Sequence, residues 1–142
     1  MRTALVWTVL ASSAVSAVAQ TTQTFRARLS PVPIELTMQA TVAGSGTVVA
    51  TLTGSKLAIS GTFDGLKSPA TTAAIHRSPV RGVRGPDLAA LTVTHGQSGT
   101  ISGSVDLSPQ QLGDLRGGRL YVQVHSEGAR DGNLWGWLLE KR

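Results

Sequence analysis

Three histidines are the residues of this sequence best suited to chemistry, and each one ends a run of strand-like residues. His76 ends TAAIH, His95 ends LTVTH and His125 ends LYVQVH. Neutral imidazole is a common ligand of copper and zinc, and side chains at neighbouring strand ends can converge at the rim of a β-fold. One hypothesis is therefore a copper or zinc site formed by His76 and His125, with His95 as a third ligand.

A structural role for these histidines is the alternative, and the ligand count favours it. A firm metal site of this kind needs three or four ligands, and no second histidine lies within a few residues of His76 or His125. His95 shares the phase of Leu91 and Val93, which places it on the expected core side. In this interpretation the histidines hydrogen-bond neighbouring loops, and the protein holds no cofactor.

Arginines form a second set of candidate residues. The segment HRSPVRGVRGPD carries Arg77, Arg81 and Arg84 among glycines and prolines. Guanidinium groups are planar forks of donors that match carboxylate, sulfate or phosphate oxygens. A solvated loop is the plainer explanation of this segment, and an anionic partner is the functional one.

Two tryptophans complete the candidates. In NLWGWLLE, Trp135 and Trp137 are two apart and share one face of a strand, with Leu134 and Leu138 on the other. If the leucines cover the core, both indole rings lie outside and offer a contact for a protein or a glycan. If the tryptophans cover the core, they are structural. The predicted partners are thus an extracytoplasmic protein or an anionic glycan.

The sequence gives no positive argument for an enzyme. Ser126 directly follows His125, and neighbours on a strand face opposite ways, so the two cannot act as nucleophile and base. The carboxylates occur singly, without the pairing that acid–base chemistry uses.

The elements that must position the candidates are strands. Alternation of apolar and polar residues predicts strands over 34–42, 46–54, 56–66, 71–76, 88–95, 100–107, 119–125 and 133–140. Gly54-Ser55 predicts a tight hairpin. Ser108 as N-cap, Pro109 at the first position and Gly117 at the end predict one short helix. Many short strands of this kind indicate an antiparallel sandwich or barrel.

The first nineteen residues have the layout of a secretory signal peptide. Arg2 precedes a short apolar run, and Ala17 and Ala19 stand at the −3 and −1 positions of a cleavage site. We therefore predict one exported domain over 20–142, periplasmic or extracellular. No segment of that domain is apolar enough to span a membrane.

Composition narrows the function further. The chain has no cysteine, which excludes disulfides and thiolate chemistry. Its formal net charge is +5, but the basic residues are scattered and the aromatic residues are few. Nucleic acid is therefore not a predicted partner.

The order of several segments resembles the CHRD domain, the domain named after chordin. The segments are FRARLSP, GTVVATL, LAISGTFDGL, TAAIH, GQSGTISGSVDLSPQQLGDLRGGRLYVQVHS and GNLWGWL, between about Phe25 and Leu138. The resemblance implies an antiparallel Greek-key β-sandwich, immunoglobulin-like or superoxide-dismutase-like, with one short helix, and this is the fold we predict. It also implies an exported binding or structural module without catalytic activity, in a bacterial single-domain form.

The chain departs from the family pattern at its candidate sites. Ala74 stands where the family has the first histidine of a His-x-His strand, so only His76 remains. The loop that follows is richer in arginine, and Trp135-Gly136-Trp137 replaces an Arg-Gly-Gln sequence. The alternative function is a copper-binding or superoxide-dismutase-like metalloprotein that uses His76, His125 and His95.

Overall fold

The computed structural model describes Ala14 and residues 21–141. The predicted signal peptide, residues 1–19, lies outside the described residues apart from Ala14. The strands are β1 Thr22–Pro31, β2 Ser45–Thr53, β3 Lys56–Asp64, β4 Ala70–Arg77, β5 Asp87–Val93, β6 Gly99–Asp106, β7 Leu120–Ser126, β8 Ala129–Trp137 and β9 Leu139–Glu140. A 3₁₀ turn η1, Leu36–Met38, follows β1, and a helix α1, Pro109–Arg116, precedes β7.

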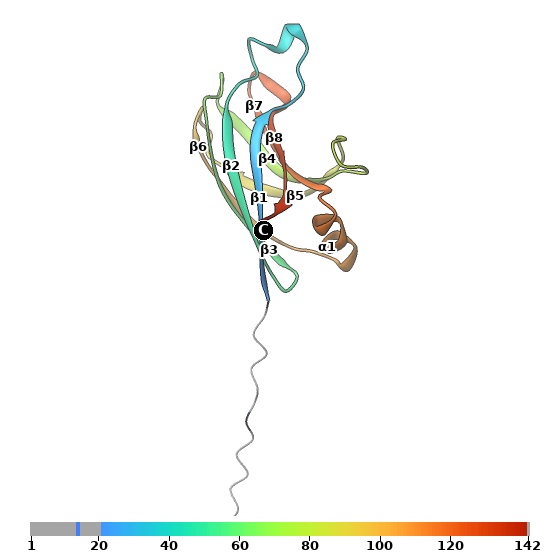
Figure 1. Cartoon of the computed structure of the whole chain (residues 1–142). Helices are drawn as coiled ribbons and strands as arrows, with labels where there is room; N and C mark the ends of the chain where they lie inside the picture. Colours follow the sequence, from blue (N-terminus) through green and yellow to red (C-terminus); the bar gives the residue numbers. More distant parts are fainter. Residues whose placement is uncertain (1–13, 15–20, 142) are drawn as a thin grey trace, which may run out of the picture.

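Within the described residues, eight antiparallel strands form a closed barrel (Figure 1). Their order is β2-β3-β6-β5-β4-β7-β8-β1, and β1 pairs with β2 to complete the ring. The short β9 also pairs with β1. The predicted all-β class with one short helix is confirmed. The predicted two-sheet sandwich is wrong, because pairing continues around the ring and leaves no open edge between two sheets.

Two short seams explain why a sandwich and this barrel share one strand pattern. β5 meets β6 only at Thr92 and Val93, and β1 meets β8 at Ser30 and Pro31. The other pairings are longer and join the strands into two halves, β1-β2-β3-β6 and β5-β4-β7-β8. Alternation along a strand reports that one face is buried, but it carries no information about these seams.

One hydrophobic core fills the barrel. Alternate residues of each long strand point inward and are buried, such as Phe25 of β1, Leu57 of β3 and Val122 of β7. Gly136 of β8 also faces inward, where a Cβ atom would collide with the backbone carbonyl of Arg28. The glycine therefore lets β8 approach β1 closely at the seam.

The expected strand over 34–42 is not formed. Leu36–Met38 is a 3₁₀ turn, and Leu36 is 85% exposed. Alternation was present, but Pro33 lacks an N–H donor and the segment has no partner strand. A second small cluster instead holds the segment against the outside of the barrel; it contains Val32, Val42, Ala129, Met38 and Trp135.

Helix α1 begins as predicted. The Ser108 side chain accepts a hydrogen bond from the Gln111 backbone N–H, and the Gln111 side chain accepts one from the Ser108 backbone N–H. Leu115 is buried in the core and Leu112 packs at its border. The capping box and this apolar pair fix the helix beside the start of β7.

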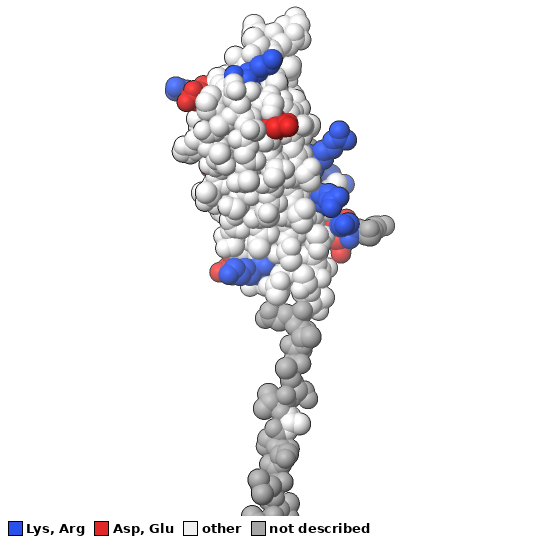
Figure 2. Space-filling view, turned by 90° about the vertical axis from the view of Figure 1, so that its left-hand side faces the viewer, with Lys and Arg blue, Asp and Glu red and all other residues white. Residues whose placement is uncertain are grey.

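The outside of the barrel differs from one side to the other. The strand β3 alternates regularly between buried and exposed residues. Figure 2 shows the side on which β2 and β6 lie in Figure 1, a broad surface with its charged side chains mainly at the margins. On the opposite half, every residue of β7 except His125 is buried. Loops therefore cover the outer face of β4, β7 and β8.

Candidate functional site

The outer face of β4, β7 and β8 collects most of the predicted site residues. Tyr121 of β7 lies opposite His76 of β4 and Trp137 of β8, and Gln123 lies between Ala74 and Trp135. Their neighbours in sequence point into the core. His76 and His125 thus lie on a sheet face that loops enclose, and the expectation that they meet at an open rim is wrong.

A pocket of about 590 Å³ lies on this face. Its floor comes from the strands, and its walls come from the 33–38 segment, the β4–β5 loop and the β7–β8 hairpin. The lining residues are Pro33, Glu35, Met38, His76, Arg84, Gly85, Tyr121, Gln123, His125, Arg130 and Asp131. Two of them are basic and two acidic, apart from the histidines, so the wall has no strong net charge.

His76 is buried, with a relative exposure of 6%, and its ring is fixed from one side. Nδ1 lies 3.0 Å from the carbonyl oxygen of Gly85 and 3.2 Å from Oδ1 of Asp87. Both partners are acceptors, so Nδ1 carries the proton. Nε2 is buried without a hydrogen-bond partner. In the neutral ring, Nε2 therefore carries an unused lone pair on a residue that lines the pocket.

Gly85 makes this arrangement possible. A Cβ atom there would collide with the carbonyl oxygen of Arg77, so the loop can approach β4 only with glycine at this position. The Gly85 backbone also exchanges hydrogen bonds with the Tyr121 hydroxyl, which accepts from its N–H at 2.9 Å and donates to its carbonyl at 3.2 Å. A register shift at His76 in the β4–β5 pairing accompanies the loop.

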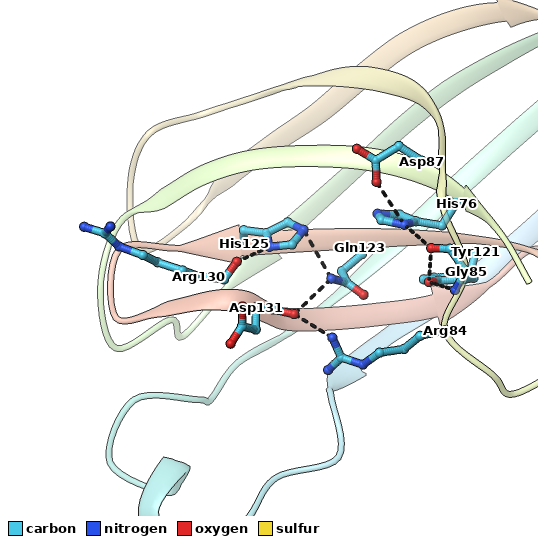
Figure 3. Close-up of polar contacts among 9 residues, drawn as sticks. All are labelled: His76, Arg84, Gly85, Asp87, Tyr121, Gln123, His125, Arg130 and Asp131. Atoms are coloured by element: carbon cyan, nitrogen blue, oxygen red, sulfur yellow. Dashed lines mark hydrogen bonds and ion pairs between the residues drawn. The ribbon is translucent and has the colours of Figure 1, made fainter.

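His125 is held in the same manner at the other end of the pocket. Nδ1 donates to the carbonyl oxygen of Arg130 at 2.7 Å, and Nε2 accepts from the Gln123 side chain at 3.2 Å. The ring centroids of His76 and His125 are 6.4 Å apart. Figure 3 shows the two rings extending toward one another. The structure therefore brings together the two histidines that the sequence proposed as a pair.

Gln123 is the polar residue of the site that sequence reasoning missed. It is only 3% exposed; its Nε2 also donates to the carbonyl of Asp131, and its Oε1 is buried without a partner. The signal was available, because a glutamine between two valines in an otherwise apolar strand needs a buried partner.

The tryptophans lie on the outer face, half-buried. Leu134 and Leu138 are fully buried in the core, which settles the two alternatives for this strand in favour of the leucine face. The rings are packed rather than free: Trp135 contacts Trp137 with centroids 4.6 Å apart, and both contact Tyr121. Tyr121 also stacks on His76 at 4.9 Å.

The three predicted arginines have three different hydrogen-bond or ion-pair partners. Arg84 donates to the carbonyl of Asp131 at 2.6 Å and lies 5.7 Å from the centre of the Trp135 ring. Arg77 pairs with the fully buried Asp114 of α1 at 2.5 Å, and Arg119 pairs with the same carboxylate. Arg81 donates to the carbonyl of Gly117 at 3.2 Å. The sequence missed Asp114 and Arg119 because their pairing with Arg77 is long-range.

His95 does not join the other histidines. It is exposed in the turn between β5 and β6. That turn lies beside the start of β4, where Ala70 donates to the carbonyl of Gly96, whereas His76 lies near the end of β4. Within residues 21–141, no group of three or more His, Cys, Asp or Glu side chains is arranged to hold a metal ion. The candidate metal ligands that the described residues bring together are therefore the two imidazoles of His76 and His125.

Comparison with known protein families gives a match over most of the chain. The family model of the CHRD domain matches residues 25–138, most of the chain. The chain therefore belongs to the CHRD domain family. Neither a curated protein nor a solved structure matches the sequence. In the described residues, no helix has the length and hydrophobicity needed to cross a membrane.

Proposed function

We propose that the chain is an exported, non-catalytic binding module of the CHRD type, and that its ligand binds in the outer-face pocket. The observation that supports this most is a pair of buried acceptor atoms without partners, His76 Nε2 and Gln123 Oε1, on two residues that line the pocket. A buried unpaired polar atom costs about 1–3 kcal/mol. A ligand that donates hydrogen bonds to both atoms would offset that cost.

The ligand chemistry follows from these acceptors. His76 Nε2 and Gln123 Oε1 both accept, so the matching groups are amide, hydroxyl or ammonium donors. The lining carries Arg84 and Arg130 against Glu35 and Asp131, and this balance does not select a strongly charged ligand. Protein segments and glycans both present such donors.

An NMR titration tests this proposal. The isotope-labelled domain 20–142 is titrated with lysine amide and with N-acetylglucosamine, which present ammonium, amide and hydroxyl donors. We expect chemical-shift changes at His76, Gln123 and His125 that disappear in Gln123→Leu. They persist in the matched control Gln110→Leu, whose side chain is exposed on α1. Equal responses in the two variants, or changes confined to other surfaces, would overturn the proposal.

Copper binding is the second candidate, and one observation favours it. Each histidine donates Nδ1–H to a backbone carbonyl, so Nε2 would be the coordinating atom, and the two rings extend toward one another. Coordination by His125 would require the Gln123 side chain to give up its hydrogen bond to Nε2. Such outer hydrogen bonds fix the ring and tautomer of metal-binding histidines. With two imidazoles, the site would be weak unless Gln123 Oε1 or an exogenous group adds a ligand.

Calorimetric titration with copper(II) tests the second candidate. We expect stoichiometric binding by the domain that is lost in His76→Ala/His125→Ala and retained in His95→Ala, the exposed control. Circular dichroism verifies that each variant is folded. Copper binding that survives the double substitution, or no binding by the parent domain, would remove the metalloprotein hypothesis.

Export is the part of the proposal that rests on the first nineteen residues. Expression of the full chain in a bacterium with an intact secretion system should yield a periplasmic or extracellular product that begins at Gln20. Cell fractionation checks the location, and intact-mass measurement of the product checks the cleavage position. A full-length product retained in the cytoplasm would contradict the prediction.

A further inference from the structure

A second cavity, of about 410 Å³, is lined mainly by the end of β4 and the β4–β5 loop, and it shares Arg84 and Gly85 with the outer-face pocket. Its lining residues are Arg77, Pro79, Arg84, Gly85, Pro86 and Arg119. Half of these lining residues are arginines, and none of them is acidic. The cavity brings together two arginines from the predicted cluster and a third, Arg119, that comes from the segment before β7.

The three guanidinium groups are held in place. Asp114, fully buried on α1, pairs with Arg77 at 2.5 Å and also with Arg119. Arg119 makes a further hydrogen bond to the Pro79 carbonyl at 3.4 Å. Arg84 is fixed by the Asp131 carbonyl and by the Trp135 ring. Preorganised side chains lose little entropy when a ligand binds.

Their hydrogen-bonding capacity exceeds these contacts. A guanidinium carries five N–H donors, and the contacts described above use one donor of Arg77, two of Arg119 and one of Arg84. One carboxylate, Asp114, neutralises one of three positive charges. The side chains of Arg77 and Arg119 remain 39% and 38% exposed, so they reach solvent at the cavity. The cavity is therefore a locally positive site with unused forked donors.

We propose that this cavity binds an organic oxyanion, a phosphate or sulfate group attached to a small organic body such as a sugar. Guanidinium forks match the oxygens of these groups. The volume exceeds what a single tetrahedral anion needs, and the two prolines and Gly85 provide an apolar wall for the attached body. The cavity shares only Arg84 and Gly85 with the outer-face pocket, and the inference stands apart from the proposed function.

Titration at low ionic strength tests the proposal, because salt screens exposed charges. The domain is titrated by NMR with inorganic phosphate, inorganic sulfate, glucose 6-phosphate and glucose. We expect glucose 6-phosphate to bind with shifts at Arg77, Arg84 and Arg119, and glucose not to bind. Arg84→Gln should weaken binding on the order of tenfold, because a charge-assisted hydrogen bond is lost. Arg84 is the variant of choice because it lies outside the Asp114 ion pairs.

Arg28→Gln is the matched control, since Arg28 is exposed on β1 and does not line the cavity. Its affinity for glucose 6-phosphate should stay within about twofold of the parent, the change expected from net charge alone. If the inorganic ions bind as well as glucose 6-phosphate, the recognised group is the oxyanion itself. Weaker binding of the inorganic ions shows that the apolar wall contributes. Absence of binding by all oxyanions, or equal weakening by Arg84→Gln and Arg28→Gln, overturns the proposal.

Discussion

The outer faces of β3 and β7 differ although their inner faces are alike. Along β3, Ser60 and Thr62 are exposed between buried Ile59 and Phe63, as expected for a strand with one wet face. Along β7, Tyr121 and Gln123 are as buried as the core valines between and beside them. The β3 side is a plain wall of the barrel, visible in Figure 2, and the β7 side is enclosed by loops.

This difference in burial of the outer faces identifies the candidate site, because buried polar side chains mark it and no sequence motif does. Burial of polar groups is unfavourable unless hydrogen bonds compensate. On β7, the backbone of Gly85, Arg130 and Asp131 supplies most of that compensation. His76 Nε2 and Gln123 Oε1 are left over. A fold that covers polar side chains and leaves acceptors unpaired at a pocket has the features of a binding site, and β3 has none of them.

Replacement of Tyr121 tests this comparison with the largest expected effect. Tyr121→Ala removes a nearly fully buried ring that contacts His76, Trp135 and Trp137. The free energy of unfolding should fall by about 3–5 kcal/mol, as for aromatic residues of a core. Thr62→Ala on the exposed face of β3 should change it by less than about 0.5 kcal/mol. Urea denaturation measures both, and similar losses in the two variants would show that the faces are energetically equivalent.

Much of the fold could be predicted because it depends on local patterns. Ser108 and Pro109 define the start of α1, and Gly54-Ser55 joins β2 to β3 as expected. Closure of the barrel depends on short seams at Thr92–Val93 and Ser30–Pro31, and no local pattern encodes them. The turn at Leu36–Met38 was missed for the same reason, since alternation does not reveal whether a partner strand exists.

Of the site, only the proximity of His76 and His125 could be predicted from the sequence. The sequence proposed His76 and His125 as a pair, and the structure has both on one outer face. The enclosing loop could not be inferred, because its position depends on Gly85 packing against the end of β4. The pairing of Arg77 with Asp114 could not be inferred either, because the two residues are distant in sequence.

The ion pairs at Asp114 provide the next test, because they tie α1 to the β4 and β7 side of the barrel. Asp114→Ala removes a buried carboxylate from Arg77 and Arg119. We expect a loss of about 2–3 kcal/mol, below the range for fully buried pairs because both guanidinium groups still reach water. Asp106→Ala, an exposed residue at the end of β6 on the plain side, is the control and should have little effect. Thermal or urea unfolding gives both values, and a neutral Asp114→Ala would contradict the assigned role.

The N-cap of α1 should have a smaller effect. Ser108→Ala removes the side-chain acceptor for the Gln111 backbone N–H and half of the capping box. The expected cost is about 1 kcal/mol. Ser104→Ala on the exposed face of β6 is the matched control, for which a change below about 0.5 kcal/mol is expected. A loss equal to that of the control would mean that packing of Leu115, rather than the cap, positions the helix.

The smallest effect is expected at Asp87, and its size decides what orients His76. Asp87 is 77% exposed, so its contact with Nδ1 of His76 is screened by water and should contribute less than about 0.5 kcal/mol. The Gly85 carbonyl remains as an acceptor for the same proton at 3.0 Å. Asp87→Asn should therefore leave both stability and the ring orientation unchanged, with the ring ¹⁵N chemical shifts of His76 still reporting an Nδ1–H tautomer. A change of tautomer would show that the carboxylate, and not the loop backbone, directs Nε2 into the pocket. In that case the acceptor atom His76 Nε2 would depend on the exposed residue Asp87. The enclosed β7 face would then rely on a solvent-exposed contact, and it would differ less from the open β3 face than the burial of their side chains indicates.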